Sequence, residues 1–381
     1  MSIRAQLLTI AKLLGALPRT KLPFLSIYLD TAWDDEMQRD RVRIFLKNEF
    51  TKIKSSLSKE AQVQASFKHD AAKIEDYVFG VLPDNTKGLV VFACHGENIF
   101  NPFPLPVQFI PRVVSTDRPY IRPLVRAVDE NKTALVARLH ADQGEIYEIS
   151  FGDMDWTYIL ESEVPKKVMA GGWSQMRYQR HTEARVRDHL TEIAKRLIKI
   201  SDQEKIKYVY LFGPETLTAK FQEKLPKRLR LSVQMETEPK SNASKEDLKM
   251  RVATLLTKQE RLEEKQKLKK LAEMAQAGDK AVIGLEQTLV AINQAAVQEL
   301  MISDSYTERG WECSHCFTLG KSLRDQCPNC EHPLIQVPHL GNALVAKVLI
   351  QDGKIEEIID NEEWDRAGGI GAFIRFQPQN L

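Results

Sequence analysis

Apolar and polar positions alternate or recur at helical spacing along the first 130 residues, which predicts a mixed α and β domain. Residues 24–30 and 88–94 read as strands, because apolar side chains dominate each short run. A helical stretch rich in Arg and Lys lies between them at about 35–56. The passage 101–123 contains six prolines, which exclude regular helix and central sheet there.

A second segment, 131–243, begins with three consecutive strand patterns and then alternates helix and strand. The expected strands are 133–139, 145–151, 155–161, 208–212 and 229–233. A glycine-containing loop at 170–175 precedes a helix expected at about 178–200, and another helix follows the strand at 208–212. This order predicts an α/β domain with a mixed sheet.

A long charged helix is expected at 244–275, with an apolar stripe and a charge-dense stretch at 257–270. Those charges are read as a solvated face, with RNA contact as the alternative. The last segment, 276–381, predicts a small α/β/α domain interrupted by a Cys-rich insertion at 311–335. Its expected elements are helices at 284–293 and 342–350 and strands at 299–303, 355–359 and 371–376.

Charge and cysteine usage narrow the class of protein. Lys and Arg number 54 against 52 Asp and Glu, and a net charge of +2 argues against nucleic-acid binding by bulk charge alone. Contact with RNA would need local basic patches. Four of the five cysteines cluster within 18 residues, unlike a disulfide framework, so we expect a reducing, cytoplasmic location.

The first residues recur at helical spacing, but Arg4 and Lys12 interrupt the apolar run. We interpret them as an amphipathic helix docked on the first domain, not as a signal peptide. No segment reaches the roughly 18 uninterrupted apolar residues of a membrane-spanning helix. We therefore expect no membrane partner.

The Cys-rich insertion has the spacing of a metal module. Cys313 and Cys316 form one pair and Cys327 and Cys330 a second, with ten residues between the pairs. Two such pairs supply four thiolates, the tetrahedral set that structural zinc prefers. We expect zinc to stabilise this segment and to take no part in chemistry, with His315 and His332 as less favoured substitute ligands.

The segment with the most functional information is Ala170-Gly171-Gly172-Trp173-Ser174-Gln175-Met176-Arg177-Tyr178-Gln179-Arg180-His181. Its two glycines allow backbone conformations closed to other residues. Helical spacing places Arg177, Arg180 and Arg187 near one stripe with His181, and guanidinium groups suit phosphate. An exposed Trp173 would stack on a base. The alternative is an ordinary surface loop with Trp173 packed inward.

This segment resembles the middle domain of archaeal-eukaryotic peptide release factors and their Pelota relatives, which has Gly-Gly-Gln and then Arg-Phe-x-Arg at the start of a long helix. The present chain keeps the glycines, the spacing to both arginines and the aromatic residue between them. The segments beginning at Gly284 and Gly368 resemble landmarks of the family's third domain. The chain is identified as a member of the divergent bacterial branch, the Balon-like branch.

The resemblance implies an A-site-binding translation factor whose glycine loop enters the peptidyl-transferase centre of the ribosome. There Gly171, Gly172 and Gln175 would help to hydrolyse peptidyl-tRNA by positioning water and stabilising an oxyanion. Ribosomal RNA would contact Trp173, Arg177, Arg180, His181 and Arg187. The third domain would bind a translational GTPase, and the protein is expected to act as a monomer.

Two departures from the family pattern shape the functional hypotheses. Trp173 stands where the family has its catalytic Gln, and an indole N–H cannot accept a hydrogen bond from water. The stop-codon reader's Asn-Ile-Lys-Ser has only a coincidental echo at residues 52–55, so stop-codon reading is not expected. Ribosome rescue with peptidyl-tRNA hydrolysis is the leading hypothesis. A non-catalytic hibernation factor is the second, and a zinc-containing RNA-binding adaptor is the third.

Overall fold

The computed structural model divides the chain into two compact units. The middle unit contains Asn131–Gln259, and the composite unit combines Ala5–Glu130 with Glu260–Leu381. The division falls inside one continuous helix, α8 (Lys245–Gln276). The residues that the structure describes are 3–35, 37–83, 86–151, 153–161, 173–230, 233–236, 244–322 and 324–378.

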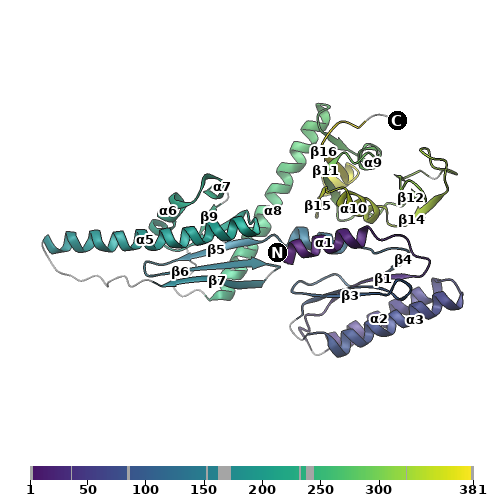
Figure 1. Ribbon diagram of the computed structural model, residues 1–381, viewed down its shortest axis with the longest axis horizontal. Helices are drawn as coiled ribbons and strands as arrows, with labels where there is room; N and C mark the ends of the chain where they lie inside the picture. The colour runs from purple at the N-terminus through teal and green to yellow at the C-terminus, as the bar shows by residue number, and fades with distance from the viewer. Residues whose placement is uncertain are drawn as a thin grey trace. The chain divides into compact units, whose positions relative to one another are not determined.

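The first half of the composite unit is a four-stranded antiparallel sheet in the order β3-β2-β1-β4, with two helices on one face (Figure 1). Alternate residues of β1 and β2, such as Ile27 and Val91, pack against Leu46 and Phe67 of those helices. The elements are β1 (Phe24–Asp30), α2 (Gln38–Ser56), α3 (Ala61–Asp76), η1 (Tyr77–Val81), β2 (Gly88–Cys94), η2 (His95–Glu97), β3 (Ile99–Leu105) and β4 (Arg112–Thr116). Both predicted strands are confirmed.

The proline-rich passage contains more regular structure than the sequence indicates. Pro102 and Pro104 lie in β3, which is an edge strand, so the sheet loses no central hydrogen bond to either ring. Pro123 lies in the first turn of α4 (Arg122–Glu130), where a helix needs no backbone N–H donor. These prolines therefore lie in an edge strand and in the first turn of a helix, where proline is compatible with strand and helix.

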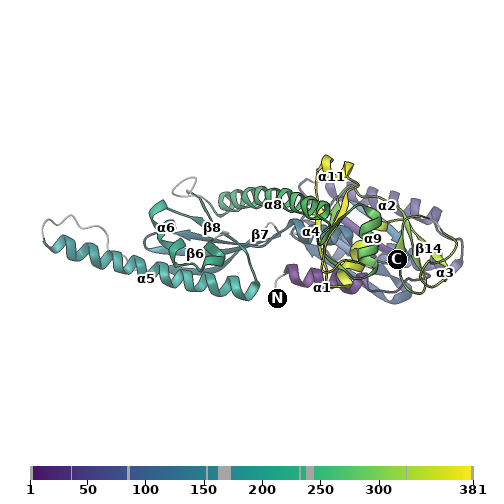
Figure 2. The same cartoon turned by 90° about the horizontal axis from the view of Figure 1, so that it is seen from above.

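The middle unit has a five-stranded mixed sheet in the order β7-β6-β5-β8-β9. One face packs against α5 and α6, and the other packs against the first part of α8 through Leu248 and Val252 (Figures 1 and 2). The two faces use alternate residues of β5: Leu135 faces α5, and Val136 faces α8. The elements are β5 (Ala134–Leu139), β6 (Gln143–Ser150), β7 (Asp153–Glu161), α5 (Trp173–Glu204), β8 (Tyr208–Phe212), α6 (Glu215–Lys224), α7 (Lys227–Arg230) and β9 (Val233–Glu236).

Two predicted boundaries in this unit are wrong. Helix α5 begins at Trp173 and not near residue 178, because no helix breaker follows Gly172. Leu229 lies in the short helix α7, and the last strand begins only at Val233. Buried Leu229 packs against the same core as α5, so its apolar character reflects helix packing and not a strand.

The second half of the composite unit is a four-stranded sheet in the order β10-β16-β11-β15. Its elements are β10 (Ala281–Ile283), α9 (Leu285–Asn293), β11 (Val297–Ser303), α10 (Leu340–Ile350), β15 (Lys354–Ile358), α11 (Glu362–Arg366) and β16 (Ile370–Ile374). The second part of α8 packs on this sheet through Leu271, next to Met301 and Trp364. The prediction of a multidomain α/β fold is confirmed.

Helix α1 (Ile3–Gly15) packs differently from the expectation of a helix docked on the first domain alone. A Cβ added to Gly15 would lie 3.1 Å from Ile121 Cδ1 and 3.2 Å from Ala346 Cβ of α10, so α1 also touches the C-terminal sheet's helix. Lys12 forms an exposed ion pair with Asp352. None of the described helices is long and apolar enough to cross a membrane.

A buried ion pair joins the two halves of the composite unit. Arg122, at the start of α4, donates from Nε and Nη2 to the two carboxylate oxygens of Glu357 at 2.8 and 2.9 Å, and from Nη1 to the carbonyl of Tyr306 at 2.6 Å. Burial raises the pKa of Glu357, and the hydrogen bonds from Arg122 oppose that rise. Asn342 accepts from the backbone N–H of Ile121 at 2.8 Å, which satisfies a donor at the helix start.

Removing one partner of this pair should therefore destabilise the composite unit strongly. We expect Arg122→Met to lower the free energy of unfolding by about 3–5 kcal/mol, because Glu357 would stay buried without its counter-charge. Combining Arg122→Met with Glu357→Leu should recover much of that loss, since no buried charge remains. Urea denaturation followed by circular dichroism measures the free energy of unfolding of the single and the double variant. A double variant as unstable as the single one would contradict the electrostatic explanation.

Candidate metal centre and basic helix

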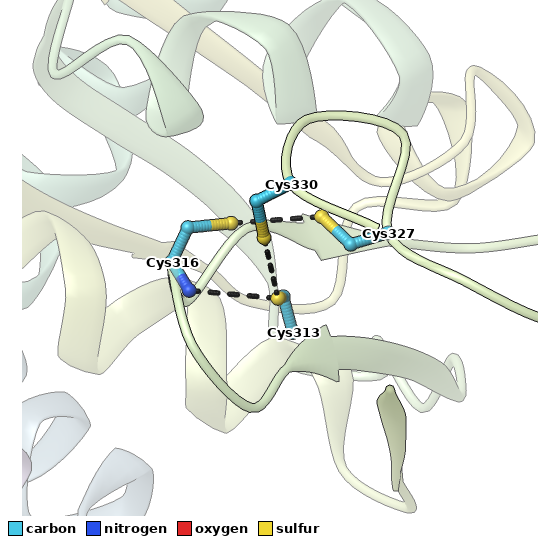
Figure 3. A group of neighbouring side chains, drawn as sticks. All are labelled: Cys313, Cys316, Cys327 and Cys330. Atoms are coloured by element: carbon cyan, nitrogen blue, oxygen red, sulfur yellow. Dashed lines mark hydrogen bonds between the residues drawn. The ribbon is translucent and has the colours of Figure 1, made fainter. Parts of the chain in front are cut away.

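The four predicted cysteines lie together in a small ribbon inserted before α10 (Figure 3). The ribbon has three strands in the order β13-β12-β14: β12 (Gly310–Cys313), β13 (Leu319–Gly320) and β14 (Leu334–Val337). The Sγ atoms of Cys313 and Cys330 are 3.4 Å apart, those of Cys316 and Cys327 are 3.5 Å apart, and all four lie within 4.8 Å of one another. Zinc–sulfur bonds of about 2.3 Å in a tetrahedron separate the sulfurs by about 3.8 Å, so the set fits zinc.

The two cysteine pairs sit in turns of the same design. The backbone N–H of Cys313 donates to the carbonyl of Thr318 at 2.9 Å, and that of Cys327 donates to the carbonyl of His332 at 3.0 Å. Each pair is followed by a residue in the left-handed region, Phe317 at φ 57° and Glu331 at φ 58°. This repeated geometry turns both sulfurs of each pair toward the sulfurs of the other pair.

Backbone amides already favour sulfur in its charged form. The N–H groups of His315 and Cys316 point to the sulfur of Cys313 at 3.4 and 3.5 Å, and that of Asn329 points to Cys327 at 3.4 Å. Burial raises the pKa of Cys316, but hydrogen bonds from Thr318 outweigh it and lower that pKa to about 6. Metal ligation requires thiolate, so this environment is suited to holding a cation.

The flanking histidines occupy the outside of the ribbon. The rings of His315 and His332 stack with centroids 4.1 Å apart and 14° between planes, and both side chains are exposed. Nδ1 of His332 lies 2.7 Å from the carbonyl oxygen of Cys330. Ligand atoms of these two histidines and Cys330 also lie within 4.8 Å of one another. The four sulfurs form the more buried group.

Side chains that the sequence does not single out hold the ribbon in place. Asn293 of α9 both donates to and accepts from the backbone of Leu319, at 2.8 and 3.0 Å. Lys347 of α10 donates to the carbonyl of Phe317 at 2.7 Å. Trp311 packs directly on Gly320, where an added Cβ would lie 2.1 Å from the ring. The sequence gives no signal for Asn293 and Lys347, because only the fold brings these two residues to the ribbon.

The second candidate site is the start of α5. Arg180, His181 and Arg187 are exposed on this helix, and the seven-residue step from Arg180 to Arg187 places both arginines on one face. Trp173, Gln175 and Arg177 lie in the first two turns of the helix, and their side chains lie outside the description. Gly171 and Gly172 themselves lie outside the described residues.

Among the α5 residues whose side chains are described, those that pack on the sheet lie in the later part of the helix. Its residues in the hydrophobic core are Leu190, Ile193, Ala194, Leu197 and Ile200, with Val186 at the border. No residue from Arg180 to Asp188 is buried. Figure 1 shows the beginning of α5 extending past the ends of the strands. The exposed residues Arg180, His181 and Arg187 therefore lie on a part of α5 that is outside the core of its unit.

The glycine-containing segment lies within a region that matches a known protein family. Residues 119–255 match the model of bacterial archaeo-eukaryotic release factor family 10. Among curated proteins, none matches the chain. The match covers both the glycine pair and the whole of α5.

Several solved structures are similar over most of the chain. A model of ribosome-bound archaeal Pelota and ABCE1 is 12% identical over 98% of this chain and 95% of that chain, with a TM-score of 0.43. Dom34 of S. cerevisiae, a translation termination-like factor involved in RNA quality control pathways and interacting with Hbs1, is 14% identical over 77% of this chain and 81% of that chain, with a TM-score of 0.42. The archaeal translation termination factor aRF1 is 18% identical over 98% and 97%, with a TM-score of 0.27.

The sulfur geometry predicts one tightly held zinc ion per chain. We expect Cys313→Ser or Cys327→Ser to reduce bound zinc to a small fraction of one equivalent, because three thiolates cannot complete the tetrahedral set. His315→Ala combined with His332→Ala should leave the zinc content unchanged. Elemental analysis of the purified variants measures the zinc content per chain. Loss of zinc in the histidine variant would show that an imidazole replaces one of the sulfurs.

Proposed function

We propose that this chain, whose residues 119–255 match bacterial archaeo-eukaryotic release factor family 10, is a ribosome-binding translation factor of the release or rescue type that occupies the A site. The main support is the position of Gly171-Gly172 directly before α5, within the matched segment. At 32 residues α5 is about 48 Å long, and no residue from Arg180 to Asp188 is buried. Such an arm suits delivery of a glycine tip into a narrow RNA-lined site.

The basic face of α5 is the proposed RNA contact. Arg180 and Arg187 are exposed on one side of the arm, with His181 beside Arg180. Guanidinium groups bind phosphate oxygens in a bidentate manner, and the whole chain has a net charge of only +2. A local stripe of this kind gives affinity for ribosomal RNA without general attraction to nucleic acid.

The reaction proposed for the tip is hydrolysis of the ester that joins the peptide to tRNA. Water attacks the ester carbonyl carbon, the bond from that carbon to the ribose oxygen of tRNA breaks, and the ribose oxygen takes a proton from the water and leaves as a hydroxyl. Backbone N–H groups at Gly171-Gly172 would donate to the oxyanion, and Gln175 would orient the water. No nucleophilic side chain is needed for this mechanism.

The start of α5 at Trp173 favours a second function, a non-catalytic hibernation factor that blocks the A site and the peptidyl-transferase centre. Trp173 directly follows Gly171-Gly172, where the family has its Gln, and Gln175 comes two residues later in α5. In this second function Gln175 takes no part in chemistry. The indole of Trp173 would instead stack on a base and plug the site.

The remaining assignments rest on the same family membership. We propose that the C-terminal sheet and its helices bind a translational GTPase, that the four cysteines hold zinc, and that the protein works as a monomer in the cytoplasm. Zinc would supply structure only, because four sulfurs leave no ligand position for water. Stop-codon reading is not part of the proposal.

Release of peptide from stalled ribosomes separates the two functions. If the chain is a hydrolase, Gln175→Ala should slow release by about 100-fold, in line with the loss of one positioning or oxyanion group. Trp173→Gln, which restores the family's residue, should speed release. The measurement is single-turnover hydrolysis of labelled peptidyl-tRNA on purified complexes. No release by the natural sequence, with ribosome binding intact, supports hibernation and contradicts catalysis.

Charge reversal on the arm tests the RNA contact in either function. Arg180→Glu combined with Arg187→Glu should weaken ribosome binding by at least tenfold and lower the salt dependence of affinity by about one to two ion equivalents. Lys195→Glu combined with Lys199→Glu is the matched control, because it makes the same charge change on exposed residues farther along α5. Sedimentation at several salt concentrations measures affinity. Equal losses in both variants would indicate bulk charge and not the stripe.

A further inference from the structure

The cysteine ribbon is attached on two sides within the composite unit. On one side, Asn293 and Lys347 bind it to α9 and α10. On the other side, its strand β12 reaches the end of the first sheet through a single acidic residue, Glu312. The ribbon therefore touches both halves of the composite unit, although it is inserted in only one of them.

Glu312 is a buried carboxylate held between two arginines from the first half of the chain. Its Oε2 accepts from Arg19 Nε at 3.1 Å and Nη2 at 2.5 Å, and from Arg118 Nη2 at 2.7 Å. The side chains of Glu312, Arg19 and Arg118 are 6%, 19% and 16% exposed. Arg19 also pairs with Asp117, so part of its charge is balanced inside the first half. The stability that such a desolvated ion pair contributes depends strongly on the geometry of its hydrogen bonds.

The position of Glu312 depends on the cysteine turns. Glu312 directly precedes Cys313, and on β12 it pairs with Leu319 of β13 and Ile335 of β14. Strands β12 and β14 have four residues each and β13 has two, which is too little sheet to be stable alone. The chain between β13 and β14 contains the second cysteine pair, so a bound ion is what closes the ribbon around β12.

We propose that the ribbon is a metal-dependent latch, in which zinc holds Glu312 in place so that it fixes Arg19 and Arg118 of the first half of the chain. Without the ion, β12 loses its fixed position and both arginines are released to solvent. The separate pair between Arg122 and Glu357 does not involve the ribbon, so it keeps the two halves connected. The latch is independent of the proposed ribosomal function and adds a role for the metal beyond folding its own segment.

Arginine-selective labelling with phenylglyoxal, followed by mass spectrometry of the full-length protein, tests the latch. In the zinc-bound protein Arg19 and Arg118 should react slowly, while Arg41, which pairs with Asp35 but is 59% exposed, gives the rate of a solvent-accessible arginine. Removing zinc with EDTA should raise labelling of Arg19 and Arg118 at least fivefold. Arg122, at 8% exposed, should stay protected. Protection of Arg19 and Arg118 after zinc loss contradicts the latch, and so does simultaneous exposure of all three.

A substitution tests the same link with zinc still bound. Glu312→Gln keeps the size of the side chain but removes its charge, so Arg19 and Arg118 should label at least threefold faster while the zinc content stays at one equivalent. Glu308→Gln is the control, because Glu308 is 44% exposed on the same segment and pairs with Lys321. Unchanged labelling in Glu312→Gln, or an equal rise in both variants, overturns the proposal.

Discussion

The guanidinium of Arg122 is buried against the carboxylate of Glu357, and this contact decides how the beginning and the end of the chain form one unit. A charge pair removed from water tolerates little displacement, since each partner needs the other to offset desolvation. Helix α4, which begins at Arg122, is therefore held against β15. Its last residue, Glu130, is also the last residue before the chain enters the middle unit.

Both chain connections of the middle unit are consequently anchored in the composite unit. One follows Glu130, which accepts a hydrogen bond from Arg261 at 2.9 Å, and the other passes through α8 itself. Burial raises the pKa of Glu264, which also accepts from Arg261, to about 7. Within the middle unit, the described residues of α5 that pack on the sheet lie in the later half of the helix.

Several features could be predicted from local pattern alone. The spacing of the four cysteines was sufficient to predict that their sulfurs lie together, because two-residue spacing constrains the backbone regardless of what surrounds it. Strands β1, β2 and β8 and the extent of α8 were also predictable, since their apolar periods are long and uninterrupted. The start of α5 was predicted too late, because the glycine pair indicated a longer loop, although Gln175, Met176 and Arg177 favour helix. Leu229 looked like part of a strand, but its apolar side chain faces a helix core.

The sequence by itself determined the order of elements, the cysteine set and the glycine-arginine segment with its family resemblance, because each depends on residues close together in the chain. Only the tertiary structure decided that Glu312 meets Arg19 and Arg118, that Arg122 meets Glu357, and that Arg180 and Arg187 of α5 are exposed. Contacts between residues hundreds of positions apart leave no periodic signal. These contacts form because a buried charge is stable only when the fold places its partner beside it.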